Sequence, residues 1–200
     1  FSGPYVYGDG LLFADGNRDA TPLDRAREIL RQNPEYRRVI KDYFGGKEIL
    51  TSPTQSPVRM VIDLAQMTLD EARERWPLVV EIADKKSRPA RALVKRASYR
   101  ERWWQFAEPQ PALRAAMAGK TRVLMHAFTS KFLAFVFVSA DAIVGQPHAV
   151  LVVDDFASFS VLQSRIHEYW VQYFGSSMAS TMRYPVSDVF ITFPFPDAVR

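Results

Sequence analysis

The most regular hydrophobic pattern in the chain lies between residues 78 and 97. Apolar residues recur there every three or four positions, which places them on one face of an α-helix that turns by about 100° per residue. These residues are Val79, Ile82, Ala83, Ala90, Leu93, Val94 and Ala97. The opposite face carries Lys85, Arg88, Arg91 and Lys95. Pro89 has no amide hydrogen for the helix ladder, so we expect a kinked or divided helix whose basic stripe faces away from the core.

A second helical pattern covers residues 156–174, and shorter apolar runs precede it. Its apolar positions are Phe159, Leu162, Ile166, Tyr169, Trp170 and Tyr173, with Gly175 in the place of a C-terminal cap. The runs "TRVLMHAF", "FLAFVFV" and "AVLVVDD" predict three strands that are buried on both faces. A short helix between Pro111 and Gly119 precedes these strands, and "DVFITF" predicts a last strand.

Short strands and helices also alternate over the first 77 residues. The opening "PYVYGDGLLF" predicts a strand or hairpin with a turn at its "GDG". Thr21 predicts the cap of a helix that ends near Asn33 and restarts at Pro34. The runs "YFGGKEIL" and "VRMVIDLA" predict strands, and Thr68 with Glu71 fits a capping box at the start of a further helix.

Together these elements predict an α+β fold in which helices flank a mixed β-sheet core. The chain has 200 residues, of which 48% are hydrophobic, and this is enough for one sizeable core. We therefore expect a single domain over residues 1–200. Within it we expect an N-terminal lobe over about 1–77, a basic helical segment over about 78–108, and a C-terminal sheet and helix over about 109–200.

The composition limits the kinds of site and the location of the protein. Cysteine is absent, which excludes disulfides and thiolate metal sites and favours a cytoplasmic location. No apolar run approaches the roughly 20 residues of a membrane span, and the first residues do not form a signal-peptide pattern. The chain starts without methionine, so we expect it to be one part of a larger protein.

Positive charge is concentrated in one segment. The chain has 26 basic and 22 acidic residues, yet residues 85–104 contain eight Lys or Arg and only one acid, Glu101. Basic groups without acidic partners repel one another unless a polyanion neutralises them, and nucleic-acid phosphates bind such a surface in a salt-dependent manner. The adjacent Trp103 and Trp104 predict one ring in the core and one ring presented to solvent or to a base.

Catalytic motifs in the chain are weak or missing. His126, His148 and His167 are scattered and lack the spacing of metal ligands on a helix face. The segment "NPEY" (33–36) resembles the base-holding loop of amino-group DNA methyltransferases but has Glu35 in place of a proline, so a helix break at the proline is the better interpretation. The acids and lysines of "EIADKK" (81–86) belong to the amphipathic helix. We therefore expect this chain by itself to have no catalytic and no metal site.

Five stretches of the chain are similar to one known family. They are "YFGGKEI" (43–49), "TSPTQSPVRMVIDL" (51–64), "RERWWQFAE" (100–108), "VLQSRIHEYWVQYFGSSM" (161–178) and "SDVFITFPFP" (187–196). In this order they resemble the C-terminal target-recognition region of large adenine-N6 DNA methyltransferases of restriction-modification and phage-defence systems. The resemblance implies a domain that reads the sequence of double-stranded DNA, with loops that enter the major groove.

The resemblance and the basic stripe together imply two groups of DNA-contacting residues. Contacts to the DNA backbone are expected from Arg88, Arg91, Lys95, Arg100 and Arg102, with Lys47, Trp104 and Arg183 as weaker candidates. The expected base-reading segment is "HAFTSK" (126–131), in which His126, Thr129, Ser130 and Lys131 supply donors and acceptors, with the loop 139–148 beside it. Relatives commonly carry arginine and histidine near Phe128 and Phe132, and "TPSD" where this chain has "PVSD" (185–188), so the bases that it reads are not implied.

The same resemblance implies what accompanies this chain. It implies an N-terminal methyltransferase domain of the parent protein as a partner, with S-adenosylmethionine as the parent's cofactor and Mg²⁺ where a nuclease is fused; no cofactor is expected in this chain. Two alternatives stay open. One is an assembly domain whose basic helix docks on an acidic partner, and the other is a metal-dependent hydrolase in which Asp154, Asp155 and Glu168 converge on one ion.

Overall fold

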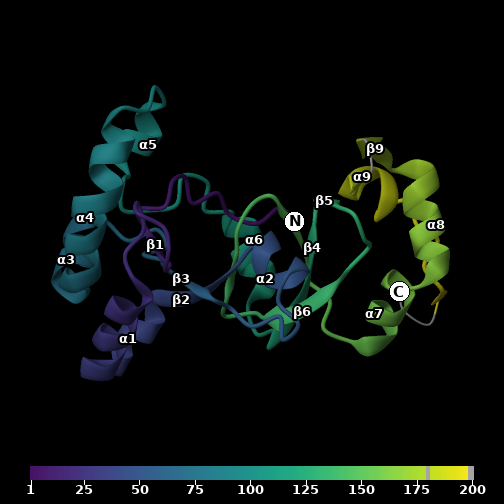
Figure 1. Cartoon of the computed structure of the whole chain (residues 1–200), viewed down its shortest axis with the longest axis horizontal. Coiled ribbons are helices and arrows are strands. Elements are labelled where there is room, and N and C mark those ends of the chain that lie inside the picture. Colours follow the sequence, from purple (N-terminus) through teal and green to yellow (C-terminus); the bar gives the residue numbers. More distant parts are fainter. Residues whose placement is uncertain (179–180, 198–200) are drawn as a thin grey trace. The chain divides into compact units, whose positions relative to one another are not determined.

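The computed structural model describes residues 1–178 and 181–197, so the end of the predicted C-terminal part, 198–200, lies outside the described residues. The chain divides into two compact units (Figure 1). The N-terminal unit comprises Pro4–Gln110, and the C-terminal unit comprises Phe1–Gly3 and Pro111–Arg200. The basic helical segment belongs to the N-terminal unit. Each unit combines helices with antiparallel strand pairs, and the predicted α+β class is confirmed.

The N-terminal unit is built around a central strand, β3. Its elements are β1 (Leu12–Phe13), α1 (Leu23–Gln32), the 3-10 helix η1 (Pro34–Arg38), β2 (Ile40–Phe44), α2 (Gly46–Leu50), β3 (Arg59–Ile62), α3 (Leu69–Arg75), α4 (Pro77–Ala92) and α5 (Ala97–Glu101). Strand β3 pairs antiparallel with β1 on one side and β2 on the other. Helix α1 contacts β1 and β3, and its buried Ala26 and Ile29 face this core. The sheet and α1 thus share one apolar layer.

The N-terminal cap of helix α3 agrees with the prediction, whereas that of helix α1 does not. The box at the start of α3 is confirmed: the Thr68 amide donates to the Glu71 carboxylate (2.8 Å), and the Glu71 amide donates to the Thr68 hydroxyl (3.3 Å). The prediction that Thr21 caps α1 is wrong. The free amide of Leu23 donates instead to the carboxylate of Asp15, at 3.0 Å.

The segment "YFGGKEIL" is a strand only as far as Phe44. The Gly45 amide donates to the carboxylate of Glu48 (2.9 Å), and this bond starts helix α2 where the sequence pattern predicts a continuing strand. A local hydrogen bond to an acidic side chain therefore ends the strand.

Helix α4 is rotated relative to the prediction. It runs through Pro89 as one helix, and its buried residues are Val79, Val80, Ala83, Ser87 and Arg91. Ala90 and Leu93, predicted to be buried, are exposed. The backbone of Gly10 lies so close to this helix that a Cβ atom on Gly10 would stand 2.6 Å from the Cα of Ser87. This close approach requires small residues at the contact, and it sets which side of α4 faces inward.

The C-terminal unit contains two small sheets and four helices in the part of the chain that the structure describes. Its elements are α6 (Pro111–Met117), β4 (Arg122–Ala127), β5 (Thr129–Ser130), β6 (Val136–Ser139), β7 (Ile143–Val144), β8 (His148–Leu151), α7 (Phe156–Leu162), α8 (Arg165–Phe174), β9 (Ser176–Met178), β10 (Thr181–Arg183) and α9 (Val186–Val189). One sheet has the order β6-β4-β8, and each of its strands overlaps one of the three predicted runs, although β6 begins only at Val136 and β8 ends at Leu151. The other sheet has the order β5-β10-β9. One buried cluster comprises Leu124, Leu133, Phe135, Leu151, Leu162, Val171, Tyr184 and Val189.

The predicted helix over 156–174 is two helices. The chain breaks after α7, and the Ser164 hydroxyl accepts the amide of His167 (3.2 Å), which caps the start of α8. The predicted strand "DVFITF" is also absent from the described residues, because α9 occupies its first part. No described helix has the length and the apolar character that crossing a membrane requires.

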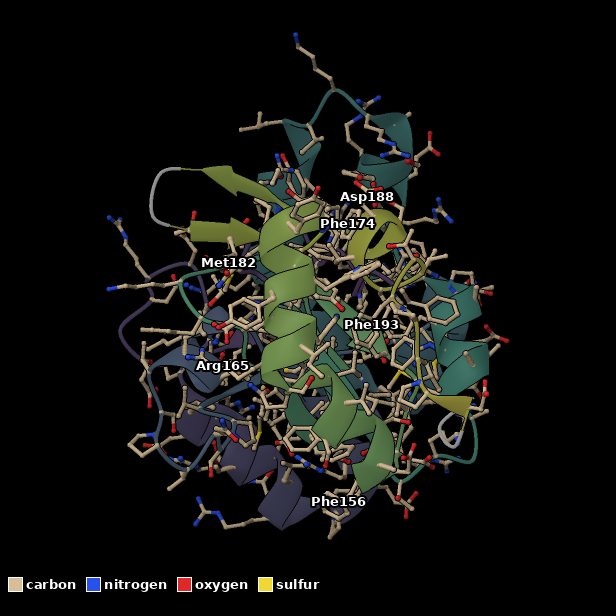
Figure 2. All side chains as sticks on the ribbon, turned by 90° about the vertical axis from the view of Figure 1, so that its right-hand side faces the viewer. Phe156, Arg165, Phe174, Met182, Asp188 and Phe193 are labelled. Atoms are coloured by element: carbon tan, nitrogen blue, oxygen red, sulfur yellow. The ribbon has the colours of Figure 1, made fainter. Side chains whose placement is uncertain are left out.

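The face that α8 buries differs from the predicted one. Figure 2 looks onto the outer side of α8, from Arg165 at its start to Phe174 at its end. The predicted core positions Ile166, Tyr169 and Tyr173 are exposed by 73%, 63% and 81%. The buried positions are His167 and Val171. The apolar spacing correctly indicated a helix, but it did not indicate which side meets the core.

Candidate nucleic-acid interface

Thr129 and Arg183 lie side by side on the smaller sheet of the C-terminal unit. Strands β5 and β10 pair antiparallel with Arg183 opposite Thr129 and Met182 opposite Ser130. The Tyr184 amide continues this pairing by donating to the carbonyl of the residue before Thr129, at 2.9 Å. The pairing brings together two polar side chains that are far apart in the sequence.

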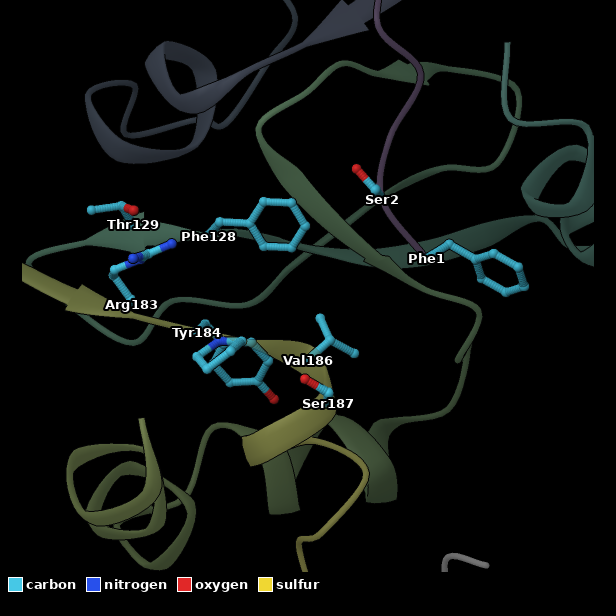
Figure 3. A pocket seen from close by; sticks show the side chains of 9 residues that line it. Phe1, Ser2, Phe128, Thr129, Arg183, Tyr184, Val186 and Ser187 are labelled. Carbon is cyan, nitrogen blue, oxygen red and sulfur yellow. The ribbon is translucent and has the colours of Figure 1, made fainter. Parts of the chain in front are cut away.

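A pocket of about 460 Å³ opens beside this pair (Figure 3). It is lined by Phe1, Ser2, Phe128, Thr129, Arg183, Tyr184, Pro185, Val186 and Ser187. Thr129 and Arg183 are both exposed. Within the described ranges, no ion pair or side-chain hydrogen bond engages the Arg183 guanidinium. The five donors of Arg183 and the hydroxyl of Thr129 are therefore available to a ligand at this edge.

The loop after β5 adds Lys131 and Phe132 to the same edge. Both are exposed, and the Lys131 ammonium lies 5.6 Å from the centre of the Phe132 ring. We call Thr129, Lys131 and Arg183 the reading edge. Thr129 and Lys131 belong to the predicted base-reading segment, whereas Arg183 ranks only as a weaker candidate in the sequence because nothing local links it to that segment.

His126 and Ser130 are buried and do not face a ligand. Only 3% of His126 and 5% of Ser130 is exposed. The Nδ1–H of His126 donates to the carbonyl of Ala134 (2.9 Å), and the Ser130 hydroxyl accepts the amide of Phe132 (3.2 Å). The prediction that these two side chains read bases is wrong. Both use their polar atoms to hold the loop that carries Lys131.

Gln163 fixes the same loop, and the sequence gives almost no signal for it. Its Nε2 donates to the carbonyl of Leu133 (2.8 Å), and its Oε1 accepts the amide of Phe135 (2.9 Å). Gln163 follows the last residue of α7, and with Ser164 it separates α7 from α8 within the predicted long helix. The break between α7 and α8 is therefore what places this amide against the loop.

His126 is expected to make the C-terminal unit sensitive to acid. Burial lowers the pKa of His126 to about 4, against the opposing effect of its bond to Ala134. In the unfolded chain the pKa of this histidine is about 6.5, so the unfolded state binds the proton more readily than the folded state. The free energy of unfolding should therefore fall by on the order of 3 kcal/mol as the pH drops from about 6.5 to about 4.

Urea unfolding at pH 7 and pH 4.5 measures this loss. The variant His126→Asn, which keeps a donor but does not titrate, should lose less between these pH values. An equal loss in the variant would assign the acid sensitivity to other groups.

Two cations of the basic segment, Lys85 and Arg88, are paired with acids of the same helix. The Arg88 guanidinium lies 2.9 Å from the carboxylate of Asp84, and the Lys85 ammonium lies 2.5 Å from that of Glu81. The expectation of an uncompensated stripe misses these acids because they precede it by one turn. Exposed pairs of this kind contribute only about 0.5 kcal/mol, so Arg88 is free to exchange its partner for a phosphate.

Arg91 does not face solvent. Its side chain is fully buried, and its guanidinium donates to the carbonyls of Gln105 (2.7 Å), Arg102 (3.3 Å) and Val6. Burial lowers the pKa of Arg91 to about 10, which leaves it charged at neutral pH. The prediction that Arg91 contacts the DNA backbone is wrong, because the rotation of α4 turns this residue inward.

The other predicted backbone contacts are on the surface. Lys95, Arg100 and Arg102 are exposed, and so is Lys47 on α2. The Arg100 guanidinium donates to the carbonyls of Val94 (2.6 Å) and Lys95 (2.7 Å). Among the residues that the structure describes, neither Lys95 nor Arg102 forms an ion pair. These two are therefore the cations best placed to meet phosphates.

The two adjacent tryptophans differ in burial, as predicted. Trp103 is 6% exposed and belongs to the core, and its ring meets that of Trp104 edge-on, with 5.7 Å between the ring centres. Trp104 is half-buried, and its Nε1 donates to the carbonyl of Met67 (2.9 Å). The edge of Trp104 that carries its only donor is therefore already used inside the N-terminal unit.

The acids of the hydrolase alternative each serve another purpose. Asp154 pairs with Lys120 (3.0 Å), Asp155 accepts the amide at the start of α7 (2.7 Å), and Glu168 pairs with Arg165 (2.5 Å). Over residues 1–178 and 181–197, no three His, Asp or Glu side chains gather as metal ligands would. The structure offers no support for a metal-dependent hydrolase at these residues.

Comparison with known proteins identifies the family. The model of the MmeI target recognition domain matches residues 11–197 of the chain. Among solved structures, the chain is similar to the type IIL restriction-modification enzyme MmeI in complex with DNA, with a TM-score of 0.70 and 20% sequence identity over 98% of this chain and 24% of that chain. No curated protein matches the chain. The chain thus spans about a quarter of the length of that enzyme. The resemblance to target-recognition regions of restriction-modification enzymes is confirmed, and the chain belongs to the MmeI target recognition domain family.

Proposed function

We propose that this domain reads the sequence of double-stranded DNA through its reading edge. The observation that carries the proposal is the β5–β10 pairing, which sets Arg183 opposite Thr129 at the rim of an open pocket. Arginine matches the two acceptors of guanine in the major groove, and a threonine hydroxyl pairs with either a donor or an acceptor. Lys131 adds a third donor from the neighbouring loop. Membership of a target-recognition family supports this role.

The backbone contacts in this proposal come from the N-terminal unit. Lys95 and Arg102 are exposed cations without an ion pair among the described residues, and Arg88 is an exposed cation that can exchange Asp84 for a phosphate. Arg100 is exposed as well, and its guanidinium donates to the carbonyls of Val94 and Lys95. Contacts from these cations neutralise phosphates whatever the sequence, so they position the duplex without selecting it. Selection would then rest on the reading edge.

The proposal includes a larger parent protein. The solved relative is about four times as long as the matched region, and its description as a restriction-modification enzyme agrees with the resemblance to adenine-N6 methyltransferases. In the parent, an N-terminal methyltransferase domain that binds S-adenosylmethionine would act at the site that this domain selects, and Mg²⁺ would serve a fused nuclease. Transfer of labelled methyl groups to adenine in a selected duplex, but not in a scrambled one, tests this part.

Arg183→Ala is expected to change which DNA sequence is preferred. Loss of one two-donor contact to a base should cost about 1–3 kcal/mol, or about 5- to 150-fold in affinity for the preferred sequence, and should relax the selection at one base pair. Selection of bound duplexes from a random library, followed by titration of the winning sequence, measures both effects.

Two matched variants separate reading from backbone contact. Lys95→Ala combined with Arg102→Ala should weaken binding to all duplexes alike and reduce the salt dependence by about one phosphate contact for each residue. Arg165→Ala removes the same charge from the same unit as Arg183 but from the exposed face of α8, and it should change neither property. If Arg183→Ala left the selected sequence and the affinity unaltered, the reading edge would not read bases.

A further inference from the structure

The connection between α4 and α5 presents one apolar side chain among cations. We call residues 93–96 the α4–α5 tip; Figure 1 shows it joining the ends of these two helices. Leu93 is 89% exposed, the highest value among the large apolar side chains in the described chain. A single exposed leucine is common on protein surfaces, so its meaning depends on how it is held and on what surrounds it.

The backbone that carries Leu93 is held from two sides. On the outer side, the Arg100 guanidinium donates to the carbonyls of Val94 and Lys95. On the inner side, the Val94 amide donates to the carbonyl of Arg91 (3.1 Å), and Arg91 is itself anchored in the core. The tip is therefore fixed before any partner binds. A protrusion that is already ordered loses little conformational entropy on binding.

The surroundings of Leu93 are cationic. Residues 93–102 include four basic residues and one acid, Glu101. Of the basic residues, Arg96 pairs with Glu108 (3.3 Å), while Lys95 and Arg102 have no ion pair among the described residues. The charge of this surface is complementary to that of a polyanion, yet its most exposed large side chain, Leu93, is apolar. A phosphate alone would leave Leu93 in water.

In DNA, anionic phosphates for the cations and apolar base surfaces for the leucine lie within a few ångströms of one another. The minor groove has a strongly negative potential that attracts lysine and arginine, and proteins that bind it often insert a leucine, phenylalanine or proline between two base pairs. A fixed leucine flanked by free cations has the chemistry that such an insertion requires.

We propose that the α4–α5 tip enters the minor groove and places Leu93 against a base step, which it partly unstacks. The proposal rests on the proposed function, because it takes duplex DNA as the partner of this domain. Lys95 and Arg102 neutralise the phosphates on either side of the contact. Unstacking at the groove bends the duplex, and the domain thereby recognises how easily a step deforms, in addition to the bases met by the reading edge.

Leu93→Ala tests the proposal on the intact chain. The duplex probe is the sequence selected by the unchanged protein, with 2-aminopurine placed at one step after another, because this base fluoresces more strongly when it is unstacked. We expect binding of the unchanged protein to raise the fluorescence at one step. Leu93→Ala should abolish this rise and weaken binding about tenfold, as expected for one aliphatic side chain removed from a contact.

Controls distinguish this proposal from the proposed function. Leu50→Ala removes another exposed leucine from the same unit and should leave both readouts unchanged. Lys95→Ala should lower the affinity but keep the rise in fluorescence. An unchanged rise with Leu93→Ala would overturn the insertion, while a retained effect of Arg183→Ala would show that DNA reading stands. If the chain bound no duplex, or if polyglutamate displaced DNA from the tip as effectively as unlabelled duplex, both the DNA partner and the insertion would be overturned.

Discussion

Arg91→Ala is expected to lower the free energy of unfolding of the N-terminal unit by on the order of 4 kcal/mol. The guanidinium is fully buried and donates to three carbonyls, those of Val6, Arg102 and Gln105. Alanine would leave these carbonyls without donors and would open a cavity beneath α5. The loss is large because the side chain joins helix α4 to two distant parts of the chain, the segment at Val6 and the segment 102–105.

Urea unfolding, followed by tryptophan fluorescence, measures this effect, since Trp76, Trp103 and Trp104 all lie in this unit. Arg102→Ala is the matched control, because it removes the same charge from an exposed position and should alter stability by less than about 0.5 kcal/mol. Arg91→Lys should recover only part of the loss, since an ammonium does not span the same three acceptors. A variant Arg91→Ala as stable as the control would show that the buried guanidinium is dispensable.

This result also decides how the basic segment should be tested for DNA binding. A charge reversal that includes Arg91 would confuse loss of folding with loss of binding. Reversal of Lys95 and Arg102 avoids this problem, because both side chains are exposed and neither forms an ion pair within the described residues. The backbone contacts of the N-terminal unit are therefore best assigned with that pair.

Glu48→Ala is expected to lower the free energy of unfolding of the same unit by about 3 kcal/mol. The Glu48 side chain is fully buried and receives two hydrogen bonds from Arg59, at 2.7 and 2.6 Å, and one from the Gly45 amide. Its removal would leave Arg59 without its acid partner. Because 24% of the Arg59 side chain is exposed, water recovers part of that loss, and the value lies at the lower end for a broken buried pair.

The contribution of Glu48 should depend on pH in a defined direction. Burial alone would raise the pKa of Glu48, but the hydrogen bonds from Arg59 and Gly45 outweigh burial and lower the pKa below its usual range. The pair therefore stabilises the unit above the unfolded pKa of about 4.3, and this contribution is lost as the pH falls through the lower folded pKa. Unfolding of the unchanged chain and of Glu48→Ala should thus differ at pH 7 and converge in acid. Lys47→Ala, at the exposed neighbouring position, should be as stable as the unchanged chain; a loss equal to that of Glu48→Ala would contradict the assignment.

Two stretches that carry the family resemblance hold the N-terminal unit together. In "YFGGKEI", a Cβ atom on Gly45 would lie 2.7 Å from the Nη2 of Arg59, so a larger residue there would displace the guanidinium that pairs with Glu48. In "RERWWQFAE", the carbonyl of Trp103 accepts the hydroxyl of Ser87 (2.8 Å), and the carbonyls of Arg102 and Gln105 accept Arg91. The contacts of these two stretches therefore stabilise the fold of the N-terminal unit.

The α+β class, the family, and those elements whose cause is local could be predicted from the order of the amino acids. The capping box of Thr68 and Glu71 lies within one turn of helix, and the strands β4, β6 and β8 follow from uninterrupted apolar runs. The sequence also indicated that one of the paired tryptophans would be buried. In each case the structure depends on contacts between residues a few positions apart or on residue type alone, and both can be recognised in the sequence.

Which helix faces are buried, and which distant residues come into contact, became clear from the folded chain. The close approach of Gly10 turned α4 so that Arg91 is buried and Leu93 is exposed, although the apolar spacing favours the reverse. The pairing of β5 with β10 placed Arg183 beside Thr129, and no pattern near either residue specifies that register. Periodicity fixes which residues share a face, but the partner that covers the face comes from elsewhere in the chain. The burial of Arg91 and the pairing of Arg183 with Thr129 at the reading edge both depend on such long-range contacts.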